Sequence, residues 1–341
     1  MRTLPRVPLQ NNGIVHYAAW APLVSFAVAL AVIAWLVRSR VAGLALDRPN
    51  RRSLHQAPVS RLGGIGVLAG VGAGWIALRP ELPWTVWPAL VLLIAVSIAD
   101  DLRGVPAHVR FAIHLAAGAL AAHTLIGDFG LLVGMVAVLT TAWMINLYNF
   151  MDGSDGLAGG MALFGFSFYG AAAWCAGNHA FGLLNFTIAA AAAAFLYFNF
   201  HPARVFLGDV GAVPLGFLAA ALGMIGWQQQ NWTWWFPGLV FSPFIADATL
   251  TLARRAMRRE RLWEAHHGHY YQRLVRMGWG HRNTALAEYA LMFACGVSAL
   301  GALAAEAEAQ LAIFCVVIIV YVALPWSIDR AWLRFEKGQP Q

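Results

Sequence analysis

Charged residues are scarce in this chain, and their scarcity excludes most soluble folds. Only 11% of the 341 residues are Asp, Glu, Lys or Arg, whereas 60% are hydrophobic, and the mean hydropathy is +0.62. Soluble domains typically carry about 25% charged residues. The composition therefore predicts an integral membrane protein, surrounded by a lipid bilayer.

Cysteine is also rare. The three cysteines, Cys175, Cys295 and Cys315, each lie inside an apolar run, so neither a disulfide framework nor a cysteine metal site is expected. The chain shows no internal repeat, low-complexity segment or separate basic domain. Its net charge of +7 therefore indicates a membrane surface or an anionic substrate, and no nucleic acid partner is expected. No cleavable signal peptide is expected either, because the first apolar run is long enough to remain as a span.

Long apolar runs are abundant. Runs of about 17 to 22 residues predict membrane-spanning helices. Eleven such runs lie near 17–37, 62–78, 83–99, 109–126, 129–148, 157–176, 180–200, 210–228, 234–252, 285–304 and 309–327. The predicted fold class is all-α: a polytopic integral membrane protein with about 10–11 transmembrane helices, forming a single domain over residues 1–341.

The basic residues orient the predicted spans. Twenty of the 23 lie in loops that follow odd-numbered spans or in the carboxyl-terminal tail. The positive-inside rule places these loops in the cytoplasm and the amino terminus outside. The predicted cytoplasmic loops cover about 38–61, 100–108, 149–156, 201–209 and 253–284.

The acidic residues follow the same pattern. Asp100 and Asp101 follow the third span, the segment NFMDGSDG (149–156) follows the fifth, and Asp209 follows the seventh. Carboxylates at the edge of lipid usually face a cavity, a partner or a metal, because each costs roughly 2.5–3.5 kcal/mol at a helix centre. Several converging carboxylates repel one another unless a cation compensates them, and hard oxygen ligands favour Mg²⁺ or Mn²⁺. The glycines among them would let backbone approach a phosphate closely. The sequence thus predicts a phosphoryl-transfer cleft at the cytoplasmic face.

Five segments in a fixed order carry a family resemblance. They are DRPNRRSLHQAPVSRLGG, ADD, NLYNFMDGSDGLAGG, FLGDVGA and HHGHYYQRL, and together they cover about residues 40–285. This set resembles the polyprenyl-phosphate N-acetylhexosamine-1-phosphate transferases, which belong to glycosyltransferase family 4. That family includes the enzymes that begin O-antigen, enterobacterial common antigen and teichoic acid linkage synthesis, together with the phospho-N-acetylmuramoyl-pentapeptide translocase.

The resemblance implies an activity. A sugar 1-phosphate would pass from a UDP-N-acetylhexosamine to undecaprenyl phosphate in the inner membrane of a bacterium, with release of UMP. The product would be the first lipid-linked intermediate of O-antigen or another cell-surface polysaccharide. The HHGHYYQRL form is closer to the O-antigen initiators, whereas Ala212 stands where many relatives carry serine.

The resemblance also implies roles for individual residues. The catalytic candidates are Asp100, Asp101, Asp152, Asp155, His266, His267 and His269, with Asp100 as base or alternatively nucleophile. The substrate-binding candidates are Asn149, Arg51, Arg52, His55, Arg61, Arg204 and Gly208. The metal candidates are Asp209 and Asp101, which would bind Mg²⁺ or alternatively Mn²⁺.

Several of these residues also have structural interpretations. Asp209 follows a glycine and could cap a helix that begins near Val210. Arg110 and His114 lie one helical turn apart and are expected to pair with Asp100 or Asp101. Asp247, inside the ninth predicted span, is expected to pair with a neighbouring polar group such as Arg254 or Arg255.

Other functions stay open at the level of sequence. Within the family, the alternative is the phospho-N-acetylmuramoyl-pentapeptide translocase. A secondary transporter also uses acids in membranes, but it would place them near mid-bilayer and usually shows a repeat. The compact one-helix motif of a CDP-alcohol phosphotransferase is absent. The sugar is undetermined among N-acetylglucosamine, N-acetylfucosamine and N-acetylquinovosamine, and a homodimer is one oligomeric state left open.

Overall fold

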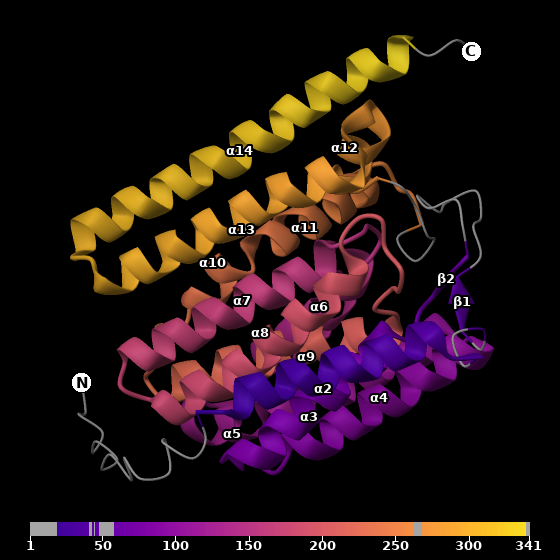
Figure 1. The fold of residues 1–341 in the computed structure, drawn as a ribbon. Coiled ribbons are helices and arrows are strands. Elements are labelled where there is room, and N and C mark those ends of the chain that lie inside the picture. Colours follow the sequence, from indigo (N-terminus) through magenta and orange to yellow (C-terminus); the bar gives the residue numbers. More distant parts are fainter. Residues whose placement is uncertain (1–18, 41–42, 44, 48–57, 262–267, 339–341) are drawn as a thin grey trace.

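The structure, a computed structural model, describes residues 19–40, 43, 45–47, 58–261 and 268–338. Its long helices run side by side as one bundle (Figure 1). In chain order they are α2 (Ala21–Arg38), α3 (Gly63–Leu78), α4 (Val86–Arg103), α5 (Ala107–Phe129), α6 (Leu131–Phe150), α7 (Leu157–Cys175), α8 (His179–Asn199), α9 (Asp209–Gln228), α11 (Ser242–Met257), α13 (Gly280–Ala304) and α14 (Ala307–Gly338). Shorter elements are α10 (Phe236–Val240), α12 (Tyr270–Leu274) and the π-helical turn η2 (Val275–Trp279).

The helices confirm the predicted all-α polytopic membrane class. A helix occupies each of the eleven predicted positions. Within the described residues, seven helical stretches are long and apolar enough to cross a membrane, and α3 is a shorter apolar helix. The seven are α2, α6, α7, α8, α9, the stretch Tyr270–Ala304 and α14.

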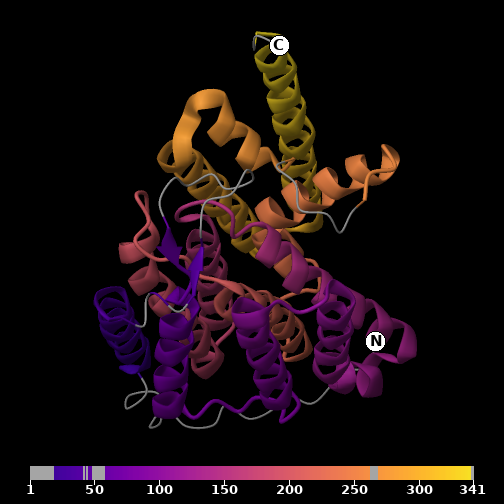
Figure 2. The ribbon, with the colours of Figure 1, turned by 90° about the vertical axis from the view of Figure 1, so that its right-hand side faces the viewer.

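The ninth predicted span is broken, which the sequence analysis did not anticipate. Helix α10 ends at Val240 and α11 begins at Ser242, with Pro243 in its first turn. Pro243 has no backbone N–H to donate to the carbonyl oxygen of Leu239, four residues earlier. The hydroxyl of Ser242 donates to that oxygen instead, at 2.6 Å. In Figure 2, α11 projects away from the rest of the bundle after this break.

Helix α14 is longer than the predicted eleventh span. It has 32 residues, and none of them is buried. The apolar run ends near Ile328, yet the helix continues through charged residues to Gly338. Hydropathy marks where a helix leaves lipid, whereas the helix itself can continue into water. The end of the apolar run and the end of α14 therefore differ.

Helix α9 lies at the centre of the bundle, and nearly all its residues are buried. Small residues let its neighbours approach closely, as is common in membrane bundles. A Cβ placed on Gly64 of α3 would lie 2.3 Å from the backbone nitrogen of Gly211. A Cβ on Gly216 would lie 2.7 Å from the carbonyl oxygen of Met144 in α6. This packing fixes the first turn of α9, and hence Asp209, against α3.

A short hairpin also reaches α9. Strands β1 (Leu46–Asp47) and β2 (Val59–Ser60) pair antiparallel, and Ser60 forms a further parallel bridge with Val205. The backbone N–H of Phe206 donates to the carbonyl oxygen of Ser60 at 2.7 Å. The first loop is thereby attached to the segment that leads into α9.

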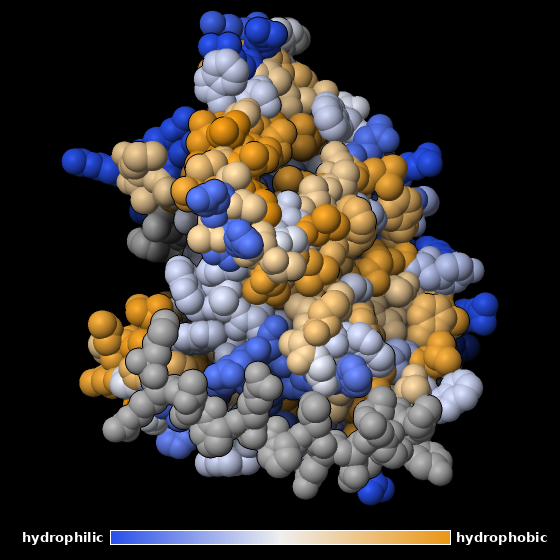
Figure 3. All heavy atoms as spheres, turned by 90° about the vertical axis from the view of Figure 1, so that its left-hand side faces the viewer, coloured by the Kyte–Doolittle hydropathy of each residue, from blue (hydrophilic) through white to orange (hydrophobic). Residues whose placement is uncertain are grey.

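The hairpin and the start of α12 lie at the end of the bundle that faces the viewer in Figure 2. Figure 3 shows the opposite end, where hydrophobic side chains cover much of the described surface and hydrophilic ones form scattered groups. The segments with candidate site residues therefore belong to one end of the molecule.

Candidate active site

A cavity of about 210 Å³ opens at that end, between segments far apart in the chain. The hairpin, the α6–α7 loop, the α8–α9 connection and the start of α13 form its walls. Its lining residues are Asp47, Arg61, Asn149, Asp152, Gly153, Ser154, Asp155, Asn199, Phe206, Gly208, Asp209 and His281. Six of the predicted site residues thus share one cavity.

Arg110 joins the acids of α4 to the acid of α9. Its guanidinium donates a short hydrogen bond to Asp100 and lies 3.4 Å from the carboxylate of Asp209. The backbone N–H of Val105 donates to the other oxygen of Asp100 at 2.6 Å. The expected pairing of Arg110 with Asp100 is therefore confirmed, and α4 is held against the start of α9.

Asp101 and Asp209 lie beside each other at this junction. The backbone N–H of Val210 donates to Asp101 at 3.4 Å. The N-cap residue of α9 is Gly208, and Asp209 occupies the first helical position. Its carboxylate lies among those of Asp100 and Asp101. The helix-capping interpretation of Asp209 is therefore not the one that the structure adopts.

Asp152 adds a further carboxyl group from the α6–α7 loop. Burial raises its pKa well above the ordinary value, and the neighbouring carboxylates of Asp209 and Asp101 raise it further, against the opposing charge of Arg61. Like charges gathered in a partly dry cavity favour protonation or the binding of a cation. The local electrostatics thus favour a positive ligand near Asp152 and Asp209.

The donor set suits a magnesium ion bound together with a substrate. Within the described residues, no three His, Cys, Asp or Glu side chains form a group that could hold a metal by themselves. Mg²⁺ is commonly held by one or two carboxylates, with substrate phosphate oxygens and water as its other ligands. Asp101 and Asp209 provide hard oxygen donors of this kind, so the residues present fit the ion.

Asp155 is held by internal contacts. It is 6% exposed, and it accepts hydrogen bonds from the backbone N–H of Ala203 at 3.1 Å and from His201 Nδ1 at 2.7 Å. These bonds attach the α6–α7 loop to the α8–α9 connection. Asp155 lines the cavity, but much of its hydrogen-bonding capacity is already used within the protein.

Arg61 is the described basic residue of the first loop that reaches the cavity. Its guanidinium donates to Asp47 at 2.7 Å, and its side chain is 41% exposed. Asp47 also lines the cavity and was not among the predicted site residues, although it is the first residue of the segment DRPNRRS. The predicted residues Arg51, Arg52 and His55 lie outside the described part of the chain.

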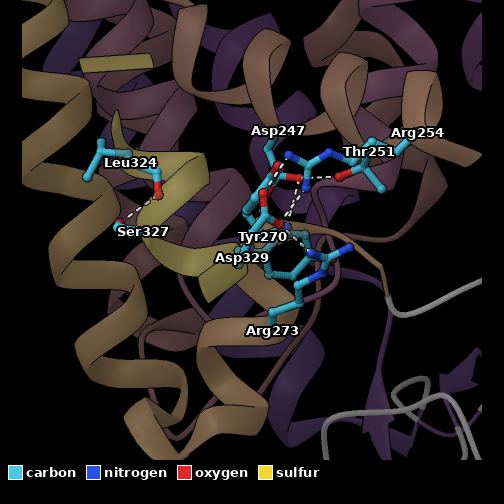
Figure 4. Close-up of polar contacts among 9 residues, drawn as sticks. Asp247, Thr251, Arg254, Tyr270, Arg273, Leu324, Ser327 and Asp329 are labelled. Carbon is cyan, nitrogen blue, oxygen red and sulfur yellow. Dashed lines mark hydrogen bonds and ion pairs between the residues drawn. The ribbon is translucent and has the colours of Figure 1, made fainter. Parts of the chain in front are cut away.

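Two aspartates, Asp247 and Asp329, bond the segment around α12, which holds the end of the predicted histidine motif HHGHYYQRL (Figure 4). His266 and His267 lie outside the described residues. His269 is 3% exposed, and its Nδ1 lies 3.0 Å from Asp247 of α11. Asp247 also accepts the backbone N–H groups of Tyr270 and Tyr271, both at 3.0 Å. The structure thus places His269 in a buried network with Asp247, and His269 is not among the residues that line the cavity.

Asp247 pairs with neighbouring polar groups, as expected. The predicted arginine partner was wrong, because these groups are His269 and the backbone of α12. Arg254 lies two helical turns further along α11 and reaches Asp329 of α14 instead, with two contacts of 2.5 Å. Arg273 of α12 bonds the same carboxylate at 2.9 Å. Figure 4 shows both arginines converging on Asp329 beside the ring of Tyr270. Three helices therefore meet at one carboxylate.

Four further residues selected from the sequence are not among those that line the cavity: Asp100, Asp101, Arg204 and His114. Arg204 donates to the carbonyl oxygen of Tyr197 at 2.8 Å and packs over the rings of Tyr197 and Phe198. The structure therefore holds Arg204 against the end of α8. His114 interacts with Asn146 of α6 at 3.1 Å, so the expected pairing of His114 with Asp100 or Asp101 is not observed.

Sequence reasoning missed His281, Ser154 and Asn199 as cavity residues. His281 lies in the predicted cytoplasmic loop 253–284, twelve residues after the histidine motif. Its place in that basic loop was the only available signal. Ser154 lies between Asp152 and Asp155, and Asn199 lies ten residues before Asp209, but their neutral side chains gave no electrostatic reason to select them.

The fold and the cavity define a polytopic membrane protein whose acidic and basic side chains meet at one end of an apolar bundle. Residues 84–227 match the model of the glycosyl transferase family 4.

Three relatives illustrate the similarity. A probable undecaprenyl-phosphate N-acetylglucosaminyl 1-phosphate transferase of Bacillus subtilis is 29% identical over 81% of this chain and 82% of its own length. A decaprenyl-phosphate N-acetylglucosaminephosphotransferase of Mycolicibacterium smegmatis is 26% identical over 87% of this chain and 82% of its own. A phospho-N-acetylmuramoyl-pentapeptide-transferase of Levilactobacillus brevis is 32% identical, but over only 35% of this chain and 38% of its own.

Proposed function

We propose that this protein transfers N-acetylglucosamine 1-phosphate from UDP-N-acetylglucosamine to a polyprenyl phosphate, with release of UMP. The observation that carries the proposal is one cavity at the end of an apolar bundle, where four aspartates, Arg61 and His281 from four separate segments meet. Such a place suits an acceptor with an anionic head and a prenyl chain in lipid. The proposed acceptor is undecaprenyl phosphate, the lipid named for the Bacillus subtilis relative.

The proposed metal ligands are Asp209 and Asp101, and the proposed ion is Mg²⁺, which Mn²⁺ could replace. When bound, the ion would neutralise charge on the diphosphate and polarise its phosphorus–oxygen bonds. Support comes from the hard oxygen donors at the start of α9 and from the carboxylates that surround them. In this arrangement Asp209 and Asp101 fix where the diphosphate lies.

The reaction requires in-line attack of a lipid phosphate oxygen on the β-phosphorus of the nucleotide sugar. Arg61 is placed in the cavity to neutralise charge that develops on the transferred phosphoryl group. Arg110 holds Asp100 and Asp209 together, so it orients the acidic side of the cavity. Asp100 and Asp101 are proposed to face the acceptor phosphate, with Asp100 as the base or alternatively the nucleophile.

The nucleotide is proposed to occupy the remaining part of the cavity. Asn149, Ser154 and Phe206 line it and offer an amide and a hydroxyl group beside one aromatic ring. Asn199 also lines it, but its amide is bonded to Gly156 and Val205. Gly208 has a φ of +70°, and a Cβ there would lie 2.3 Å from the carbonyl oxygen of Arg61. A glycine is therefore needed where the first loop meets the α8–α9 connection.

The proposed location is the inner membrane, with the cavity open to the cytoplasm, where UDP-sugars are made. The distribution of the basic residues supports this orientation. The product would be a lipid-linked sugar diphosphate for a cell-surface polysaccharide. Within the family, the muramoyl-pentapeptide activity is the second candidate, but that similarity covers about a third of the chain, whereas similarity to the N-acetylglucosamine enzymes exceeds four fifths.

A transfer assay tests the proposal. Purified protein is incubated with UDP-[¹⁴C]N-acetylglucosamine, undecaprenyl phosphate and Mg²⁺, and parallel reactions contain UDP-N-acetylfucosamine, UDP-N-acetylquinovosamine or UDP-N-acetylmuramoyl-pentapeptide. We expect chloroform-soluble label and an equal amount of UMP with the N-acetylglucosamine donor. Label that remains in water with every donor would refute the activity, and faster transfer of the muramoyl-pentapeptide would favour the second candidate.

A further inference from the structure

The α6–α7 loop, residues 151–156, is held by side chains rather than by regular backbone pairing. The backbone N–H of Gly156, a residue with a φ of +78°, donates to Asn199 Oδ1 at 2.9 Å, and its carbonyl oxygen accepts the hydroxyl of Tyr289 at 2.7 Å. Asp155 is bonded by His201 and Ala203. The shape of this cavity wall therefore depends on residues from other elements.

His281, in the first turn of α13, completes these contacts. Its Nδ1 lies 2.8 Å from the hydroxyl oxygen of Ser154 and 3.4 Å from the backbone nitrogen of Asp155. A backbone N–H can only donate, so Nδ1 is the acceptor, and the Ser154 hydroxyl donates to the same nitrogen. The same nitrogen lies 3.9 Å from the Asp155 carboxylate.

His201 supports this arrangement from the other side. Its ring stacks on the His281 ring, with centroids 5.4 Å apart and an interplanar angle of 11°. His201 Nδ1 donates to Asp155, whereas His281 Nδ1 accepts from the backbone of that residue. The two imidazoles thus grip Asp155 at its carboxylate and at its amide, and they connect α13 to the α8–α9 connection.

We propose that His281 is a positioning residue that fixes Ser154 and Asp155 in the nucleotide-binding wall of the cavity. This inference rests on the proposed function only for its kinetic consequence. Its structural content is that one unprotonated ring nitrogen on α13 sets the conformation of the loop between α6 and α7.

The test compares two substitutions that differ in one property. In His281→Asn the side-chain amide can place an oxygen acceptor where Nδ1 lies, whereas His281→Leu is of similar size and has no acceptor. Arg282→Gln, an exposed neighbour on α13, is the matched control. We expect His281→Leu to raise the KM for the nucleotide sugar about tenfold and to weaken UDP binding in calorimetry by the same factor. His281→Asn should remain within about threefold of the unchanged protein, with kcat little altered in both variants.

Hydrogen exchange gives a readout that needs no substrate. Mass spectrometry of peptides covering residues 149–157 should show about tenfold faster amide exchange in His281→Leu than in His281→Asn, with equal melting temperatures. If Leu and Asn behave alike in both exchange and binding, His281 only fills space and the inference is wrong. If the unchanged protein neither binds UDP nor transfers sugar phosphate, the proposed function fails, and the exchange comparison still decides the role of His281.

Discussion

Asp209 shows how a single side chain can connect the fold to the proposed chemistry. It opens the central helix α9, and its carboxylate lies beside those of α4 and near the guanidinium of Arg110. Uncompensated carboxylates in a partly buried cavity are unfavourable, so an arrangement of this kind is retained where a cation or a reaction requires it. The repulsion among these carboxylates is offset only while Arg110 and the proposed cation stay beside them.

The first prediction concerns this residue. We expect Asp209→Asn to lower turnover by about 10²–10³, because it removes a proposed ligand and one negative charge. Asp128→Asn is the control, since Asp128 is bonded to Gln228 near the end of α5, whereas Arg110 lies near its start. Initial rates at saturating Mg²⁺ are compared at equal melting temperatures, and unimpaired turnover by Asp209→Asn would remove it from the metal site.

At the scale of single elements, the contact between α3 and α9 determines where the acidic cluster forms. The two backbones approach so closely at Gly64 and Gly211 that neither position has room for a side chain. This approach explains why glycines, which are poor helix formers, occur inside apolar helices here.

Substitution of glycines in α3 tests this contact. We expect Gly64→Ala to destabilise the protein by about 1–3 kcal/mol, because the new methyl group would overlap the backbone of Gly211. Gly72→Ala, in the same helix but with open space around it, should be neutral or stabilising by up to about 1 kcal/mol. Thermal unfolding in detergent measures both, and equal melting temperatures for the two variants would contradict this account of the α3–α9 contact.

Helix α12 is anchored by Asp247 and Asp329, whose surroundings differ. Asp247 is 7% exposed and accepts two backbone N–H groups in addition to His269. Asp329 is more exposed, at 26%, and its ion pairs with the arginines are partly screened by solvent. We expect Asp247→Ala to cost about 2–4 kcal/mol and Asp329→Asn about 1 kcal/mol or less. A larger melting-temperature decrease in Asp329→Asn would show that the α14 contact matters more.

At the scale of the whole molecule, the reaction should be reversible. One phosphoanhydride is broken and another is formed, so the proposed transfer is nearly isoenergetic. We expect lipid-linked product incubated with excess UMP and Mg²⁺ to return UDP-N-acetylglucosamine, which chromatography would detect. If no nucleotide sugar forms under conditions that support the forward reaction, the proposed exchange is incorrect.

Much of the architecture was predictable because it depends on local sequence. A run of apolar residues long enough to cross lipid forms a helix almost wherever it occurs, since every backbone group must be bonded within the segment. The gathering of acids at one end followed from the order of the spans. The break at Pro243 was missed because the apolar run continues through it, and hydropathy does not register a missing N–H.

The contacts that position individual side chains were less predictable, because they join residues distant in sequence. His281 and Ser154 are 127 residues apart, and Asp247 selects the backbone of α12 instead of Arg254. Such partners depend on how helices pack, and several candidates of similar charge lie in each loop. The charged residues and the order of the predicted spans indicated the right end of the molecule. Helix packing decides which residues meet there.

The position of a radioactive phosphorus atom tests the central claim most directly. UDP-N-acetylglucosamine labelled with ³²P at the β-phosphorus, or separately at the α-phosphorus, is incubated with the protein, undecaprenyl phosphate and Mg²⁺. Transfer of sugar 1-phosphate predicts that β-label enters the lipid phase while α-label stays in water as UMP. Both labels in water, or both in lipid, would contradict the account.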